Sequence, residues 1–212
     1  MERDTLASMR RALGAAHPST MSALGGVAAI LNAEGRYAEA EPIVREVVEL
    51  QKRVLGPEHP STLLSIHDLS QALDGQGKHE EGERLERSVL EAEERIQGRE
   101  HADALTAREG LAYILIEENR LREAKELLAE DVRIRRNRPE TNPGELEHAL
   151  YGAAAVAARS GNVTEAARWV HMAHPLLTDA DVAAMASDDY GKMLRADPAF
   201  AAIVMAARAT PR

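Results

Sequence analysis

The sequence predicts an all-α fold, an α-solenoid of about four helical hairpins. A short motif returns every 42 residues, apolar residues recur at helical spacing inside each copy, and glycine or asparagine separates two helices in each copy. One hairpin with such an apolar stripe cannot bury it alone, whereas stacked hairpins bury it between them. The repeat therefore predicts the architecture, which the amino-acid composition alone does not.

Two anchors define the period. The tetrapeptide His-Pro-Ser-Thr begins at residue 17 and again at residue 59, and His101 opens a weaker third copy. The hexapeptide that begins at Gly35 has related copies at 77, 119 and 161. Residues 1–16 are expected to be an N-terminal cap helix or a degenerate repeat, and residues 185–212 to be C-terminal capping helices. The repeats between these ends are predicted to span 17–58, 59–100, 101–142 and 143–184, within 17–184.

The first helix of each unit is predicted from apolar positions at i, i+3 and i+7, such as Leu24, Val27 and Leu31. The position of Ala28 holds a small residue in all four units, which permits close approach of a neighbouring helix. Arg108 interrupts the first apolar column in the third unit. The helix is expected to end where a left-handed cap residue costs least. Those cap residues are Gly35, Gly77, Asn119 and Gly161.

The second helix of each unit opens with a glutamate in its first turn, where the helix dipole favours an anion. In the first unit it ends at Leu55-Gly56-Pro57, a C-terminal glycine followed by a proline. Pro18 and Pro60 then fall in the first turn of the next first helix. The histidines at the hairpin junctions are expected to pack or cap there. The opening glutamates are Glu39, Glu81, Glu123 and Glu165.

Charge and composition exclude several classes of function. With 35 acidic and 26 basic residues the formal net charge is −9, which argues against a nucleic-acid partner because phosphates are bound by Lys and Arg. The absence of cysteine excludes disulfides and thiolate chemistry, and a cytoplasmic location is expected. No apolar stretch approaches the roughly 18 residues of a membrane span. Four arginines near a predicted helix end are expected to complement the helix dipole. They are Arg133, Arg135, Arg136 and Arg138.

The repeats resemble the tetratricopeptide repeats of kinesin light chains and their bacterial relatives, whose unit also runs 42 residues. The resemblance rests on Gly35-Arg-Tyr-Ala-Glu-Ala-Glu-Pro42 and Leu55-Gly-Pro-Glu-His-Pro-Ser-Thr62, and it covers about residues 17–175. It implies a right-handed superhelix whose first helices line a concave groove for a partner's peptide or helix. It also implies an asparagine that clamps the backbone of the ligand. At that position this sequence instead has Gly26, Asp68, Gly110 and Gly152.

The same template gives a predicted partner-binding groove. The groove is expected to have a floor of small residues in the first unit and polar and aromatic groups in its middle. Its carboxylates favour a protein or peptide partner with cationic or amide donor groups. The alternative is that these are solvated helix-face residues. The predicted groove residues are His67, Asp68, Gln71, Glu109, Tyr113, Glu117, His148, Tyr151 and Arg159.

The leading prediction is a protein–protein interaction scaffold with no catalytic residue, cofactor or metal site. A self-assembling structural or regulatory module, and so a homo-oligomer, is the second interpretation. An enzyme that uses His67 beside Asp68 is the third. His79 lacks the second histidine of a zinc-protease helix, and the Gly75–Lys78 turn lacks the Ser or Thr of a phosphate loop. A pair of histidines one turn apart, at 171 and 174, makes a poor zinc site.

Overall fold

The computed structural model describes residues 12–138 and 142–173, and this part of the chain contains helices and no strand. The all-α prediction is therefore confirmed. The predicted C-terminal capping helices (185–212) lie outside the described residues, as does most of the predicted N-terminal cap (1–16). No helix in the described part is long and apolar enough to cross a bilayer. The helices are α2 (Pro18–Ala33), α3 (Tyr37–Val54), α4 (Pro60–Asp74), α5 (His79–Ile96), α6 (Ala102–Glu117), α7 (Leu121–Asn137), α8 (Pro143–Arg159) and α9 (Val163–Ala173).

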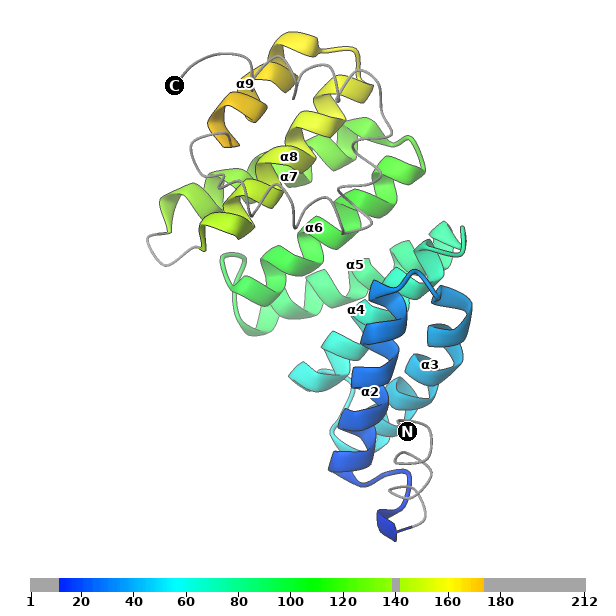
Figure 1. The fold of residues 1–212 in the computed structure, drawn as a ribbon. Helices are drawn as coiled ribbons and strands as arrows, with labels where there is room; N and C mark the ends of the chain where they lie inside the picture. The colour runs from blue at the N-terminus through cyan, green and yellow to red at the C-terminus, as the bar shows by residue number, and fades with distance from the viewer. Residues whose placement is uncertain (1–11, 139–141, 174–212) are drawn as a thin grey trace. The chain divides into compact units, whose positions relative to one another are not determined.

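The chain divides into two compact units, Met1–Gly110 and Leu111–Arg212. In the first unit α2 packs on α3 and on α4, α3 packs on α4, and α4 packs on α5 (Figure 1). In the second unit α8 packs on both α7 and α9. Helix α6 begins in the first unit and ends in the second. Each hairpin thus covers the apolar face of a neighbouring hairpin in its own unit, which is how stacked hairpins bury their stripes.

The core of each unit follows the predicted apolar columns. Leu24, Ile66 and Leu150 occupy equivalent positions and are all buried. The small-residue column that begins at Ala28 is buried in every repeat. Arg108 interrupts the first column as predicted and is nevertheless buried, because its Nη2 donates to Glu94 Oε1 at 2.6 Å. The charged residue is therefore accommodated in the core by a local ion pair.

The junction histidines cap the first helices. Nδ1 of His17 and of His59 accepts a hydrogen bond from the backbone amide two residues later, at 3.2 Å in both. His101 makes the same contact at 3.3 Å, which confirms a capping role. In the fourth repeat Asn142 takes this role and accepts from the amide of Gly144 at 2.9 Å. Asn142 lies one residue earlier than a strict 42-residue period would place the cap.

The turn inside each hairpin is the same in all four repeats. Its central residue is left-handed, with φ of 72° at Gly35 and 59° at Asn119. The amide of the next residue donates to a carbonyl five residues back, as Arg36 does to Leu31 at 2.8 Å. This is the Schellman pattern, which satisfies backbone carbonyls at the helix end. The predicted left-handed caps are confirmed at Gly35, Gly77, Asn119 and Gly161.

Candidate partner-binding cavity

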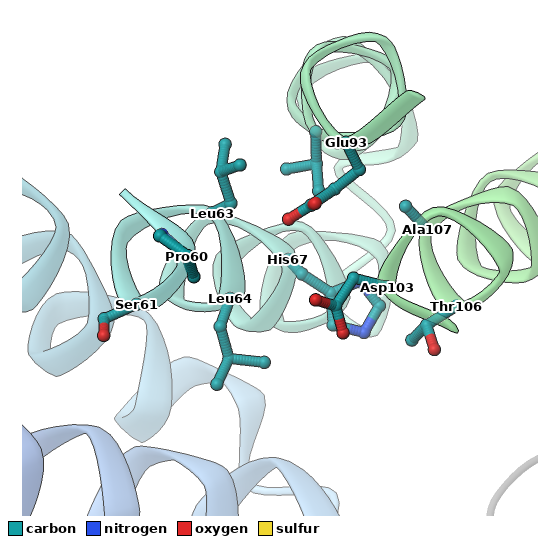
Figure 2. A pocket seen from close by; sticks show the side chains of 10 residues that line it. Pro60, Ser61, Leu63, Leu64, His67, Glu93, Asp103, Thr106 and Ala107 are labelled. Carbon is teal, nitrogen blue, oxygen red and sulfur yellow. The ribbon is translucent and has the colours of Figure 1, made fainter. Parts of the chain in front are cut away.

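A cavity of about 240 Å³ opens between α4 and α6 in the first unit, and α5 supplies a third wall. Figure 2 shows that the lining side chains come from these three helices. Helix α4 contributes half of the lining residues because its first two turns, directly after the His59 cap, run along the cavity. The lining residues are Pro60, Ser61, Leu63, Leu64, His67, Val89, Glu93, Asp103, Thr106 and Ala107.

The cavity has a buried, mainly apolar floor and an exposed rim. Leu63, Val89 and Ala107 are all at least 96% buried and form the apolar part of the floor. At the rim, the side chain of Leu64 is 61% exposed, although leucine is normally buried. Thr106 is also exposed at the rim. The site therefore offers apolar surface that another molecule can reach.

Two carboxylates lie in the cavity wall and share one amide donor. Glu93 on α5 is 3% exposed, and the side chain of Asp103 on α6 is 56% exposed. Gln97, which follows α5, donates from Nε2 to Glu93 Oε2 and to Asp103 Oδ2, the latter at 3.0 Å. His101 Nδ1 is 3.5 Å from Asp103 Oδ2. Within the part of the chain that the structure describes, neither carboxylate has a Lys or Arg partner.

A buried hydrogen-bonded cluster adjoins the cavity at His67. Nδ1 of His67 lies 2.7 Å from Oε1 of Glu86, whose side chain is fully buried. Ser70 donates its hydroxyl hydrogen to the other carboxylate oxygen of Glu86. Nε2 of His67 contacts the Gln71 amide at 2.9 Å. Because an amide offers both a donor and an acceptor, Gln71 can satisfy Nε2 in either protonation state of the ring.

The charge state of His67 follows from its neighbours. Burial lowers the pKa of His67, but the carboxylates of Glu86, Asp68 and Glu109 outweigh this and raise the pKa to about 9. His67 is therefore a cation at neutral pH, paired with Glu86. Burial raises the pKa of Asp68, and the His67 cation opposes that shift. The cluster thus carries its own counter-charge and leaves Glu93 and Asp103 uncompensated.

Gly110 allows α6 to approach this cluster. A methyl group at this position would lie 2.8 Å from Oε1 of Glu86 and 3.2 Å from Cε1 of His67. At the equivalent position of the first repeat, a methyl group on Gly26 would meet nothing within 4 Å. The two glycines therefore differ in role. Gly110 is needed for helix packing, whereas Gly26 faces open space.

Comparisons with known proteins found similarity to one repeat family in part of the chain. Residues 19–92 match the family model described as tetratricopeptide repeat. In its first two repeats, the chain is thus similar to tetratricopeptide repeats. Its fold is similar to that of a Podosopora anserina structure described as kinesin light chain nearly identical TPR-like repeats, with a TM-score of 0.68 and 24% identity over 91% of this chain and 97% of that one.

A second solved structure supports the same fold assignment. BtubC (BKLC) from P. vanneervenii aligns with a TM-score of 0.71 and 17% identity, over 82% of this chain and 70% of that one. A comparison with curated proteins found no match. The predicted solenoid of kinesin light chain-like repeats is therefore confirmed at the level of fold. Repeats of this type stack into extended surfaces that mediate protein–protein interaction.

The predicted groove residues that lie in the compact unit Met1–Gly110 surround the His67 cluster. His67 itself lines the cavity but is only 9% exposed, so it offers little surface to a partner. Asp68 is half-buried, and its carbonyl accepts from Asn32 Nδ2 at 2.8 Å, which ties α4 to α2. Gln71 is exposed beside His67, and Glu109 is half-buried on α6.

In the compact unit Leu111–Arg212, four of the predicted residues form two pairs. The hydroxyl of Tyr113 contacts His148 Nδ1 at 3.2 Å, and the two rings meet edge to face with centroids 5.8 Å apart. Arg159 Nη1 lies 3.5 Å from Glu117 Oε1. Both contacts join α6 to α8. Tyr151 differs from the expectation, because its ring is 4% exposed and belongs to the core of this unit.

Glu86 was not found by the sequence analysis, although the repeat contained a signal for it. The equivalent residues of the other second helices are Val44, Leu128 and Val170, and all three are buried. A carboxylate in an otherwise aliphatic column indicates a buried partner. The sequence pattern indicated the special role of Glu93 less clearly. The residues at its position are polar in every fully described repeat, so a carboxylate there does not stand out.

The other motifs considered from sequence have structural roles or lie outside the described residues. Nδ1 of His79 pairs with Asp74 Oδ1 at 2.6 Å. The turn at Gly77 is one of the left-handed hairpin caps. No group of three His, Cys, Asp or Glu in residues 12–138 and 142–173 is arranged to hold a metal ion. His174 lies beyond these residues.

Proposed function

We propose that this repeat protein binds a segment of another protein and holds one of its side chains in the α4–α6 cavity. The cavity itself is the observation that supports the proposal. Its volume of about 240 Å³ lies below the roughly 300–1,000 Å³ of sites that enclose small molecules. A single side chain therefore suits it better than a cofactor or metabolite.

The rim supports an extended or helical peptide rather than an isolated ligand. Leu64 is exposed at the mouth of the cavity and offers apolar contact to whatever flanks the inserted side chain. The walls are consecutive helices whose ends are fixed by caps and hydrogen-bonded turns. Because this site is preformed, little conformational entropy is lost on binding, and a small contact area can therefore give measurable affinity.

Catalysis is the less favoured alternative because of how His67 is held. Both ring nitrogens are engaged, one by Glu86 and the other by Gln71. A general base must be unprotonated and must reach the proton that it removes. His67 is a cation paired with a buried carboxylate, so it meets neither requirement. We therefore propose a binding role with no catalytic residue, and we assign His67 to holding α4 against α5.

The proposal is tested by selecting peptides from a displayed random library on the wild-type protein. The selected peptides are then measured by fluorescence anisotropy against Leu64→Asn, which removes apolar contact at the rim, and Thr106→Trp, which places an indole over the mouth. Val54→Asn is the matched control, since Val54 is 50% exposed at the end of α3 and does not line the cavity. Circular dichroism verifies that all variants fold.

We expect both cavity variants to weaken binding at least about tenfold, and Val54→Asn to leave it unchanged. Equal binding to all variants, or no enrichment of peptides, would overturn the proposal. The alternative that the protein self-assembles is tested by measuring the oligomeric state of the wild type and of Leu64→Asn by sedimentation. A dimer that dissociates on this substitution would make a second copy of the chain the occupant instead.

A further inference from the structure

We infer that the side chain bound in the α4–α6 cavity is an arginine of a partner protein. This inference rests on the proposed function and specifies its ligand. The cavity combines an apolar floor with two carboxylates in its wall, Glu93 and Asp103. An arginine side chain has the matching pattern, an aliphatic stem that ends in a cationic group.

Glu93 is a buried carboxylate without a counter-charge among the described residues. Its side chain is 97% buried, and its hydrogen-bond partner is the neutral amide of Gln97. Placing a carboxylate in such surroundings is costly unless a counter-charge is present. The nearby arginines pair with other carboxylates: Arg108 pairs with Glu94, and Arg95 pairs with Glu58. Among the described residues, the chain itself does not supply the cation that Glu93 requires.

Glu93 differs in charge balance from the residues at the same position of the other repeats. The equivalent residues Gln51 and Arg135 are also buried. Gln51 is neutral, and Arg135 is balanced by Asp131 at 2.9 Å and Glu145 at 2.8 Å. Glu93 is thus the charged residue of this column that has no opposite charge among the described residues. The exception occurs in the repeat whose second helix forms a wall of the cavity.

The groups around Glu93 are arranged to suit a guanidinium group. Gln97 holds Glu93 and Asp103 close together by donating to both from one nitrogen. A guanidinium group has five N–H donors in a planar fork, so it can donate to two neighbouring carboxylates at once. The third charged residue of the lining, His67, already pairs with Glu86 and does not compensate them. The lining is therefore net acidic and selects a cation.

The test uses a short probe, N-acetyl-Ala-Arg-Ala-amide, and its counterpart with citrulline, which is nearly isosteric and neutral. Each is titrated into ¹⁵N-labelled protein while amide chemical shifts are followed. The variants are Glu93→Gln, which imitates Gln51 of the first repeat, and Asp103→Asn. Glu91→Gln is the control, because Glu91 is an exposed carboxylate on the same helix and does not line the cavity.

We expect the arginine probe to shift the amides of Leu64, Thr106 and Ala107 in a saturable way. Citrulline should bind at least about tenfold more weakly, and each cavity variant should weaken the arginine probe by a similar factor. Glu91→Gln should have no effect. Equal binding of citrulline, or shifts confined to other surfaces, would overturn the inference. If the library-selected peptides still lost affinity with Leu64→Asn, the proposed function would stand without an arginine ligand.

Discussion

Oε1 of Glu86 lies 2.7 Å from Nδ1 of His67, and this contact joins α5 to α4 beneath the cavity. The equivalent of Glu86 in each other repeat is aliphatic and buried. The second repeat therefore replaces an apolar contact with a buried ion pair. Such pairs add little stability over a well-packed apolar contact, whereas removing one partner alone is strongly destabilising.

The first prediction concerns pH. The folded pKa of His67 is about 9, above its ordinary value of 6.5, so protonation stabilises the folded state. This contribution is fully present below pH 6.5 and is lost as the pH rises from 6.5 through about 9. NMR titration of the imidazole should give a midpoint more than one pH unit above 6.5. The double variant His67→Gln with Glu86→Gln, in which both residues are neutral, should flatten the fall in unfolding free energy over this range. A midpoint at or below 6.5 would contradict the ion pair.

The second prediction contrasts two glycines at the same repeat position. Gly110→Ala should destabilise the protein by about 1–3 kcal/mol, because the added methyl group lies 2.8 Å from Glu86 and must displace it. Gly26→Ala should stabilise it by about 0.5–1 kcal/mol, since the methyl group meets open space in the interior of α2. Urea denaturation measures both. Similar values for the two substitutions would show that α6 does not approach His67 as closely as described.

The third prediction separates two neighbouring arginines of the predicted cationic cluster. Arg135 is 3% exposed and pairs with Asp131, which is fully buried. Arg135→Met should cost about 3–5 kcal/mol, because it leaves that carboxylate without its cation. Arg136 is exposed, so Arg136→Met should change stability by less than about 0.5 kcal/mol. Denaturant unfolding of the two variants checks this, and a mild effect of Arg135→Met would exclude the buried pair.

The fourth prediction concerns the histidine caps. His59→Ala removes the acceptor for the Ser61 amide and should cost about 0.5–2 kcal/mol. His59→Asn should keep most of the stability, since Asn142 caps α8 by the same contact with the Gly144 amide. Thermal melts of the three proteins test the pair of substitutions. If asparagine were as harmful as alanine, capping would not explain the histidine.

The sequence predicted those features of the fold that depend on local periodicity. The 42-residue spacing identified the left-handed caps, the capping histidines and the buried columns, because each is determined by residues within one hairpin. The site was predicted less well. Glu86 and Glu93 lie on second helices, and only the packing of α4, α5 and α6 brings them to His67 and the cavity.

Side-chain pairing between repeats was also beyond sequence reasoning. Tyr113 and His148 were both expected at the binding surface, but whether they face a partner or each other depends on the spacing of α6 and α8. In the structure they face each other, with the Tyr113 hydroxyl 3.2 Å from His148 Nδ1 and the rings edge to face. Tyr151 is buried because α8 is covered by both α7 and α9. No pattern within one repeat distinguishes these outcomes.

The hydrogen bonds that close each hairpin turn join backbone atoms. The turn restricts the residue type only at its left-handed position, which is glycine or asparagine. Substitutions on the exposed face of the first helices therefore leave the angle between the paired helices intact. The column that begins at Ser22 shows this freedom, since it changes to Leu64 and then to Thr106 while all three remain exposed. In the binding role proposed above, single substitutions on this surface can change the partner that is bound while the arrangement of the helices stays the same.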